Sequence, residues 1–257
     1  MLVAIDIGNT NVVLGVFNQE KLVENWRVGT NAQITPDEYA MTFKDLFNFS
    51  GIEFKQITGV IISTVVPPLL PVMIEMSLKY FQIEPMVVTH KLNTGITISY
   101  DNPKEVGADR IVNAAAAFNI YGGPIIIVDF GTATTFCAVT KEGVYLGGAI
   151  SPGVKISAEA LFQRASKLPR VELLKPPKVI GADTISAMQA GIIYGYAGLV
   201  DGIVERMKKE LSPSSKVVAT GGLAELVSSE TTTIQEIKPH LTLEGLLLLY
   251  KINHQYL

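Results

Sequence analysis

The sequence predicts an α/β protein built from two copies of one unit. Residues 4–17 and 126–139 share a pattern in which an apolar run ends in an Asp, a Gly follows one residue later, and a turn rich in small polar side chains leads into a second apolar run. Gly8 follows Asp6 at the same spacing as Gly131 follows Asp129. Each stretch is typical of two antiparallel strands joined by a tight turn, and its recurrence predicts a duplication.

Each turn has the composition of a phosphate-binding hairpin. Gly8 permits a backbone turn that a Cβ would hinder and lets an anion approach the amides, while Asn9, Thr10 and Asn11 offer side-chain donors. Asp6 stands where a carboxylate could hold a hydrated divalent cation against the phosphates. Two such turns in one chain predict that a nucleotide is held between them.

The remaining segments predict alternating strands and helices, which is the pattern of a mixed α/β fold. Thr35, Pro36 and Glu38 have the spacing of a capping box and predict a helix that runs to about Phe49. The helix predicted over 185–210 is the clearest in the sequence, and its glycines permit close approach of another backbone. The other predicted elements are strands at 22–28, 57–63, 86–89 and 144–150, a strand before Gly221, and helices from 69 to 80, 111 to 121, 154 to 165 and 241 to 250.

Asp109 and Arg110 stand at the start of one of these helices. An Asp in the first turn of a helix is favoured by the helix dipole alone, so Asp109 by itself has a structural explanation. The pair, however, supplies a proton acceptor and an anion clamp at one helix N-terminus. That combination suits phosphoryl transfer to an alcohol.

The composition indicates a well-packed globular protein and excludes several classes. Of 257 residues, 48% are hydrophobic and 18% are charged, and the net charge of −3 offers no basic surface for nucleic acid. The single cysteine, Cys137, cannot form an internal disulfide and is predicted to be a small core residue. The N-terminus lacks the basic segment of a signal peptide, and the uncharged run over 184–200 is interrupted by glycines. We therefore expect a cytoplasmic protein without nucleic-acid or membrane partners.

Other nucleotide-binding signatures are absent from the sequence. It has no Gly-x₄-Gly-Lys-Ser/Thr loop and no protein-kinase signature set, and no Gly-x-Gly-x-x-Gly follows a predicted strand. No Cys/His cluster has the spacing of a metal site, and the three His, at positions 90, 240 and 254, are scattered. P-loop and dinucleotide-binding folds are therefore disfavoured.

Four segments in this order, in a chain of this length, resemble type III pantothenate kinases, which belong to the acetate and sugar kinase, heat-shock chaperone and actin superfamily. The segments begin at Asp6 (DIGNTN), Gly107 (GADR), Asp129 (DFGTAT) and Thr220 (TGG). The resemblance implies duplicated ribonuclease H-like (actin-like ATPase) domains at 1–115 and 116–257, with mixed five-stranded sheets flanked by helices and a nucleotide cleft between them. It also implies ATP-dependent phosphorylation of the primary hydroxyl of pantothenate to 4′-phosphopantothenate, the first step of coenzyme A biosynthesis.

The same resemblance implies roles for individual residues. Asp109 would be the catalytic base, Arg110 would meet the charge of the substrate, Asp6 would hold Mg²⁺ through water, and Asp129 would bind a monovalent cation, K⁺ or NH₄⁺. A homodimer with the substrate pocket near its interface is also implied. The implied ATP-binding residues are Asp6, Ile7, Gly8, Asn9, Thr10, Asn11, Val12, Val13 and Thr132. The implied pantothenate-binding residues are Tyr100, Gly107, Ala108, Asp109, Arg110 and Thr184.

Two alternatives from other classes stay open. The superfamily fold also serves regulators, so a catalytically inactive nucleotide-binding regulator is one alternative. An ATPase that activates a partner enzyme through an iron–sulfur cluster is the other. Asp109 next to Arg110 favours an enzyme, because a binding protein would not need the base. The single Cys137, inside a predicted strand, argues against the iron–sulfur protein.

Overall fold

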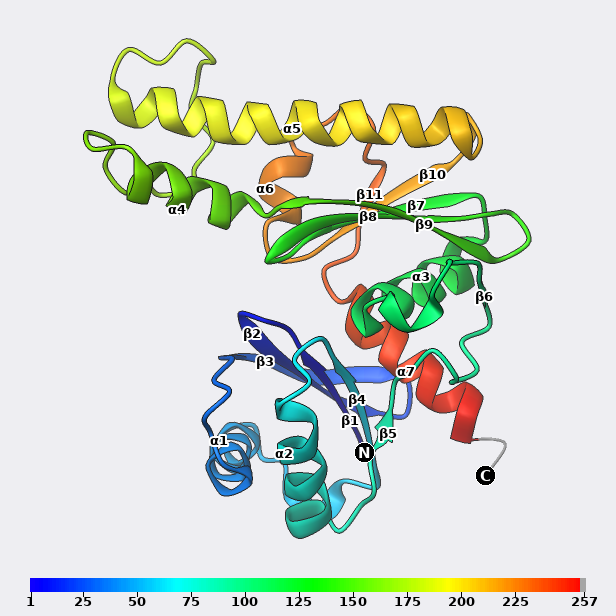
Figure 1. The fold of residues 1–257 in the computed structure, drawn as a ribbon. Coiled ribbons are helices and arrows are strands. Elements are labelled where there is room, and N and C mark those ends of the chain that lie inside the picture. Colours follow the sequence, from blue (N-terminus) through cyan, green and yellow to red (C-terminus); the bar gives the residue numbers. More distant parts are fainter. Residues whose placement is uncertain (255–257) are drawn as a thin grey trace. The chain divides into compact units, whose positions relative to one another are not determined.

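The computed structural model describes residues 1–254. The chain forms two compact units, each built around one mixed sheet (Figure 1). The first unit contains residues 1–95, 101–116 and 242–254, and the second contains residues 96–100 and 117–241. The compact units are therefore not consecutive halves divided after residue 115, because the last helix of the chain packs in the first unit.

The first unit is built on a five-stranded sheet in the order β3-β2-β1-β4-β5. β2 pairs antiparallel with β1 and with β3, whereas β4 runs parallel to β1 and to β5. The strands are β1 (Leu2–Ile7), β2 (Asn11–Asn18), β3 (Lys21–Gly29), β4 (Gly59–Thr64) and β5 (Met86–Val87). The ends of β1 and β4 therefore lie side by side at one edge of this sheet.

Helices α1 (Pro36–Phe49) and α2 (Leu69–Met76) pack on one face of the first sheet. The predicted capping box of α1 is present: the Thr35 hydroxyl accepts from the Glu38 amide at 3.3 Å, and the Glu38 carboxylate accepts from the Thr35 amide at 2.9 Å. The helix predicted through Tyr80 instead changes its hydrogen-bond pattern after Met76 and ends in a π-helical turn, Ser77–Phe81.

The opposite face of the first sheet is covered by α7 (Leu241–His254). A Cβ on Gly15 would lie 2.9 Å from a methyl group of Leu243, and a Cβ on Gly59 would lie 2.2 Å from the hydroxyl of Tyr250. Both glycines thus let the helix rest directly on the backbone of β2 and β4. The helix is longer than predicted, since it continues beyond Tyr250.

Helix α3 (Ala108–Tyr121) begins in the first unit, and its last residues belong to the second. It meets α7 where Gly245 approaches Val112, since a Cβ on Gly245 would lie 2.6 Å from that side chain. The Thr242 hydroxyl donates to the Asn113 side-chain oxygen at 2.8 Å. The start of α3 is consequently fixed within the first unit.

The second unit repeats this topology and adds one strand. Its sheet has the order β11-β10-β7-β8-β9-β6, in which β7, β8 and β9 are antiparallel neighbours and β10 is parallel to β7 and β11. The strands are β6 (Thr97–Ile98), β7 (Ile125–Phe130), β8 (Ala133–Val139), β9 (Val144–Pro152), β10 (Lys216–Thr220) and β11 (Glu236–Ile237). The predicted duplication is confirmed, and β6 makes this sheet six-stranded rather than five-stranded.

Helices α4 (Val154–Arg164), α5 (Thr184–Glu210) and α6 (Ala224–Ser228) share a core with one face of the second sheet. Among the described helices, α5 alone has the length and apolar composition that could also cross a membrane, with 44% of its apolar window buried. Cys137 is buried in β8, as predicted, with its sulfur 3.5 Å from the Tyr145 hydroxyl.

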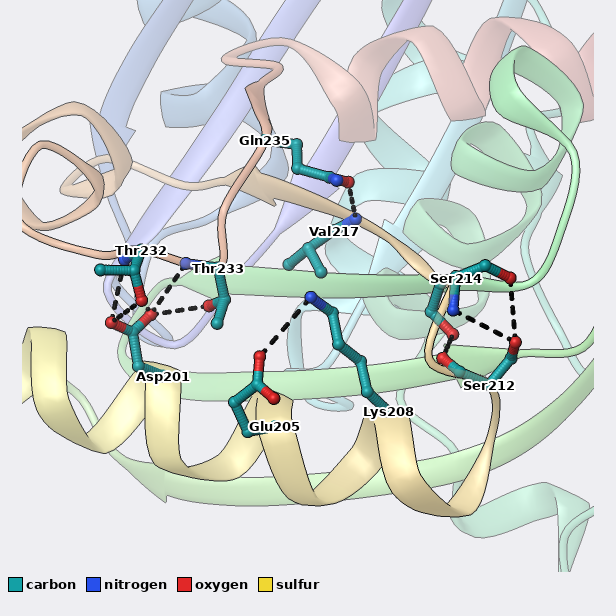
Figure 2. A network of polar contacts seen from close by, with 10 residues as sticks. Asp201, Glu205, Lys208, Ser212, Ser214, Val217, Thr232, Thr233 and Gln235 are labelled. Carbon is teal, nitrogen blue, oxygen red and sulfur yellow. Dashed lines mark hydrogen bonds and ion pairs between the residues drawn. The ribbon is translucent and has the colours of Figure 1, made fainter.

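Asp201 of α5 anchors the segment that leads into β11. Figure 2 shows its carboxylate between Thr232 and Thr233, from which it accepts both backbone N–H groups and both hydroxyls at 2.7–3.1 Å. Burial would raise the pKa of Asp201, but these hydrogen bonds outweigh it and hold the pKa below its ordinary value.

Candidate active site

The first predicted phosphate turn connects β1 to β2 and is held in a fixed conformation. The Gly8 amide donates to the Asn11 carbonyl at 2.9 Å, which closes the turn. Thr30, just after β3, donates its hydroxyl to the Gly8 carbonyl at 2.6 Å and its amide to the Thr10 carbonyl at 3.0 Å. Asn9 and Thr10 are exposed at the tip of the turn. The turn thus fits the phosphate-binding role predicted for it.

The first turn of α3 lies at the same edge of the first sheet as this hairpin. Val65, which follows β4, donates its amide to the carbonyl of Ile7 at the end of β1, at 3.0 Å. A Cβ on Gly107 would lie 3.5 Å from Val65 and 2.6 Å from the Asp109 carboxylate. Gly107 therefore lets the Asp109 side chain fold back beside the ends of β1 and β4.

Asp109 has the electrostatic character expected of a general base. Its Oδ1 accepts the backbone N–H of Arg110 at 2.8 Å, and the Arg110 side chain is buried. Burial raises the pKa of the Asp109 carboxyl, against the opposing effects of the Arg110 amide and the Arg110 charge. A carboxylate with a raised pKa is a stronger proton acceptor than an ordinary Asp near neutral pH.

The second predicted turn connects β7 to β8 and is closely surrounded by backbone. A Cβ on Gly221 would lie 2.5 Å from the Asp129 Oδ1, and a Cβ on Gly153 would lie 2.1 Å from the Thr132 carbonyl. Gly221 also has a positive φ of 95°, which a residue with a side chain rarely adopts. Gly221 thus lies against the Asp129 carboxylate, and Gly153, at the start of α4, lies against Thr132.

The two remaining predicted substrate residues lie elsewhere in the second unit. The Tyr100 ring packs on β9, where a Cβ on Gly147 would come within 2.9 Å of it, and its centroid is 6.5 Å from that of Tyr145. Thr184 is the first residue of α5 and is exposed, directly after the N-cap Asp183. Tyr100 is thus positioned by its packing on β9 and Thr184 by the start of α5.

The described residues contain no cluster of three or more His, Cys, Asp or Glu side chains able to hold a metal ion. Asp6 is a half-buried carboxylate beside the glycine turn, and hard oxygen donors of this kind suit a cation that keeps most of its waters. The residues present therefore fit a magnesium ion carried mainly by phosphate oxygens and water.

A family model described as type III pantothenate kinase matches residues 2–206. The chain belongs to the type III pantothenate kinase family. The type III pantothenate kinase of Geotalea daltonii is 56% identical over 255 residues, covering 99% of this chain and 100% of the relative. That of Halalkalibacterium halodurans is 54% identical over 253 residues, covering 98% of this chain and 100% of the relative. The predicted enzyme class, a kinase that phosphorylates pantothenate in coenzyme A biosynthesis, is confirmed by this membership.

Two more distant solved structures share the fold. Component A of (R)-2-hydroxyglutaryl-CoA dehydratase from Acidaminococcus fermentans has a TM-score of 0.57 at 14% identity, over 99% of this chain and 98% of that one. The inorganic polyphosphate/ATP-glucomannokinase of an Arthrobacter species has a TM-score of 0.53 at 15% identity, over 98% and 99% of the two chains. At these identities the similarity concerns the fold alone, and the predicted fold class is confirmed.

Two residues that lie beside the candidate site residues were not anticipated from the sequence. Gly153 appears in the sequence as part of an ordinary turn, yet its lack of a side chain lets α4 begin against the second phosphate turn. Ser63 follows the apolar run of β4 and is fully buried beside β1. A polar residue at the end of a buried strand was the available signal, since such a residue needs a partner when it is buried.

Proposed function

We propose that this pantothenate kinase uses Asp109 to accept the proton of the pantothenate hydroxyl as that oxygen attacks the γ-phosphorus of ATP. The observation that carries the proposal is the position of Asp109, at the start of α3 and beside the edge of the first sheet that holds the Gly8 turn. The new O–P bond forms as the bond from the γ-phosphorus to the bridging oxygen breaks, leaving ADP. The proton passes to Asp109 late in this step.

The phosphates of ATP would be bound by the turn of residues 6–13 and by Thr132. Fixed backbone and side-chain donors favour phosphoryl transfer because this reaction depends mainly on in-line positioning and charge neutralisation. Asp6 would hold Mg²⁺ through water, and the bound ion would neutralise charge on the phosphate oxygens. The carboxylate of Asp6 then orients the hydrated ion rather than replacing its shell.

Pantothenate would contact the start of α3, with Arg110 meeting its negative charge, and would also contact Tyr100 and Thr184. The buried Arg110 guanidinium is suited to an anion because it is always charged and directional. Asp129 would bind a monovalent cation, K⁺ or NH₄⁺, beside Thr132. The close approach of Gly221 to the Asp129 carboxylate supports this role, because a side chain at position 221 would lie against the carboxylate oxygen.

We also propose that the enzyme is a homodimer, and α5 of the second unit offers a surface for its interface. Gly191, Gly195 and Gly198 follow one face of α5, all three are exposed, and a Cβ at any of them would meet no atom within 4 Å. The monomer itself does not require glycine at these positions, whereas close packing of a second helix does. Large apolar side chains are also exposed on α4, in the segment before α5 and at the start of α5: Ile156, Leu161, Phe162, Leu174, Val179, Ile180 and Ile185. We also expect the enzyme to act in the cytoplasm.

An ATP-coupled assay with pantothenate and a panel of other small primary alcohols, with and without K⁺, tests the proposal. We expect turnover that depends on pantothenate, Mg²⁺ and K⁺, with 4′-phosphopantothenate as the product by mass spectrometry. Nucleotide binding without turnover on pantothenate would instead favour the inactive regulator.

A further inference from the structure

Ser63 is a fully buried serine whose hydroxyl has no hydrogen-bond partner among the described residues. Burying such a group unpaired costs about 1–3 kcal/mol, so it is rare in folded proteins. Ser77, the other fully buried serine of the first unit, donates its hydroxyl to the Ile83 carbonyl at 2.7 Å. The two serines are therefore equally buried, but among the residues that the structure describes only the Ser77 hydroxyl has a hydrogen-bond partner.

The register of the first sheet places Ser63 next to Asp6. β1 and β4 are parallel, and Asp6 is paired directly with Ser63. Paired residues on adjacent strands project from the same face, about 5 Å apart. Their neighbours Ile5 and Ile62 belong to the core under α1 and α2, so Asp6 and Ser63 project from the other face. This is the face that the Gly15 and Gly59 backbone presents to α7.

The duplicated unit has the same arrangement. Asp129 occupies the next-to-last position of β7, as Asp6 does in β1, and its partner on the parallel strand β10 is Thr220. Thr220 is also a buried hydroxyl residue. A hydroxyl thus lies beside the acidic residue at the equivalent position of both sheets. The recurrence of this pairing in both copies of the unit argues for a role linked to the carboxylate rather than to packing alone.

We infer that Ser63 is a positioning residue for Asp6, whose hydroxyl donates to one carboxylate oxygen so that the other is aimed at the waters of the magnesium ion bound with ATP. A rotation about the Cα–Cβ bond of Ser63 turns its Oγ toward the neighbouring strand. The Ser63 hydroxyl would then have a hydrogen-bond partner only when ATP and magnesium are bound, and the Asp6 carboxylate would lose rotational freedom. This inference rests on the proposed role of Asp6.

The test compares Ser63→Ala with the matched control Ser77→Ala. We measure the Mg²⁺ activation constant at saturating ATP and pantothenate, Mn²⁺ binding by electron paramagnetic resonance with a non-hydrolysable ATP analogue, and the Tm. For Ser63→Ala we expect Mg²⁺ activation and Mn²⁺ affinity to weaken about 10-fold, as for other groups that orient metal-binding side chains, without a fall in Tm. Ser77→Ala should lower the Tm and leave the metal dependence unchanged.

Ser63→Cys separates hydrogen bonding from packing, because it keeps the shape of the side chain, fills the space that Ser63→Ala leaves empty and weakens the donor. It should behave as Ser63→Ala does. Wild-type Mg²⁺ and Mn²⁺ dependence in Ser63→Ala, or in Ser63→Cys alone, would overturn the inference. Asp6→Asn shows which idea has failed: if it weakens the metal dependence and Ser63→Ala does not, only the role of Ser63 is wrong. If Asp6→Asn itself has no effect, the proposed role of Asp6 is wrong.

Discussion

The Asp109 carboxylate accepts a hydrogen bond from the backbone N–H of its neighbour Arg110 at 2.8 Å. This bond uses one of the N–H groups that have no partner within a helix at its N-terminus, so the start of α3 orients its own acidic side chain. One carboxylate oxygen is thereby held by the main chain. The relationship leads to the first two predictions.

Asp109→Asn should reduce kcat by about 10²-fold or more, the usual size of a general-base effect, and leave ATP affinity nearly unchanged. The amide oxygen can still accept the Arg110 N–H, and burial disfavours the charge that is removed, so the Tm should not fall. Coupled kinetics, nucleotide titration and thermal unfolding measure the three quantities. Asp45→Asn, on the exposed side of α1, is the control. Wild-type turnover in Asp109→Asn would rule out this base.

If Asp109 is the base, the pH dependence of kcat/KM should report its raised pKa. The base works only when ionised, and burial keeps it protonated to a higher pH than an ordinary Asp of pKa 3.8. Activity should therefore fall on the acidic side at a pH above that value. Profiles of the wild type and of Asp109→Asn, recorded where both are folded, check this. An acidic limb that persists unchanged in the residual activity of the variant would assign the titration to another group.

Replacing K⁺ with Na⁺ should lower the rate if Asp129 binds the monovalent cation. Asp129→Asn should then lose most of the difference between the two salts, because the amide has no charge to offer the ion. Rates are compared at constant ionic strength, with NH₄⁺ as a third salt and choline as an inert cation. Equal wild-type rates in K⁺ and Na⁺ would remove the case for this site.

Asp201→Ala should lower the free energy of unfolding by about 1–3 kcal/mol at neutral pH, because Thr232 and Thr233 lose a charged acceptor. The pKa of Asp201 is lowered in the fold, so its contribution is complete above the unfolded value of 3.8 and is lost as the pH falls through the folded pKa. Urea unfolding at neutral and acidic pH should show the difference shrinking. Glu205→Gln, which removes an exposed pair with Lys208 at 3.7 Å (Figure 2), should change stability by less than about 0.5 kcal/mol.

If the proposed homodimer forms through α5, Gly195→Lys should convert it to a monomer without destabilising the fold. Lysine is a better helix former than glycine by roughly 0.5–1 kcal/mol, and the added side chain meets no atom of its own chain at the Cβ. Analytical ultracentrifugation measures the mass. Gly29→Lys, which also places a side chain in open space but on β3, should leave the dimer intact. A wild-type monomer, or an intact dimer in Gly195→Lys, would contradict the proposed interface.

The sequence was informative where local chemistry determines structure. The capping box at Thr35 and the two hairpins follow from residues close together in the chain, and the structure contains them at the predicted places. Strands such as β6 and β11, of two residues each, have no periodicity to detect. Their existence depends on a neighbouring strand that is distant in the sequence.

The sequence could not reveal relationships that depend on register or on tertiary packing. Ser63 became significant only when the pairing of β1 with β4 placed it beside Asp6. The raised pKa of Asp109 likewise results from burial, which the motif alone does not specify. The motif residues themselves could be proposed from the sequence, because phosphate binding requires glycine, acidic and hydroxyl residues at particular spacings.

The position of α7 has a consequence for how the chain matures on the ribosome. The strands of the first sheet lie within residues 2–87, yet one face of the sheet is covered by α7, which is translated well after them. Until Leu243 and Tyr250 emerge, the backbone of Gly15 and Gly59 is uncovered. During synthesis, one face of the first sheet therefore stays uncovered until α7 has been made. A chain that stops before residue 242 should expose this face to chaperones and should not form a functional first unit.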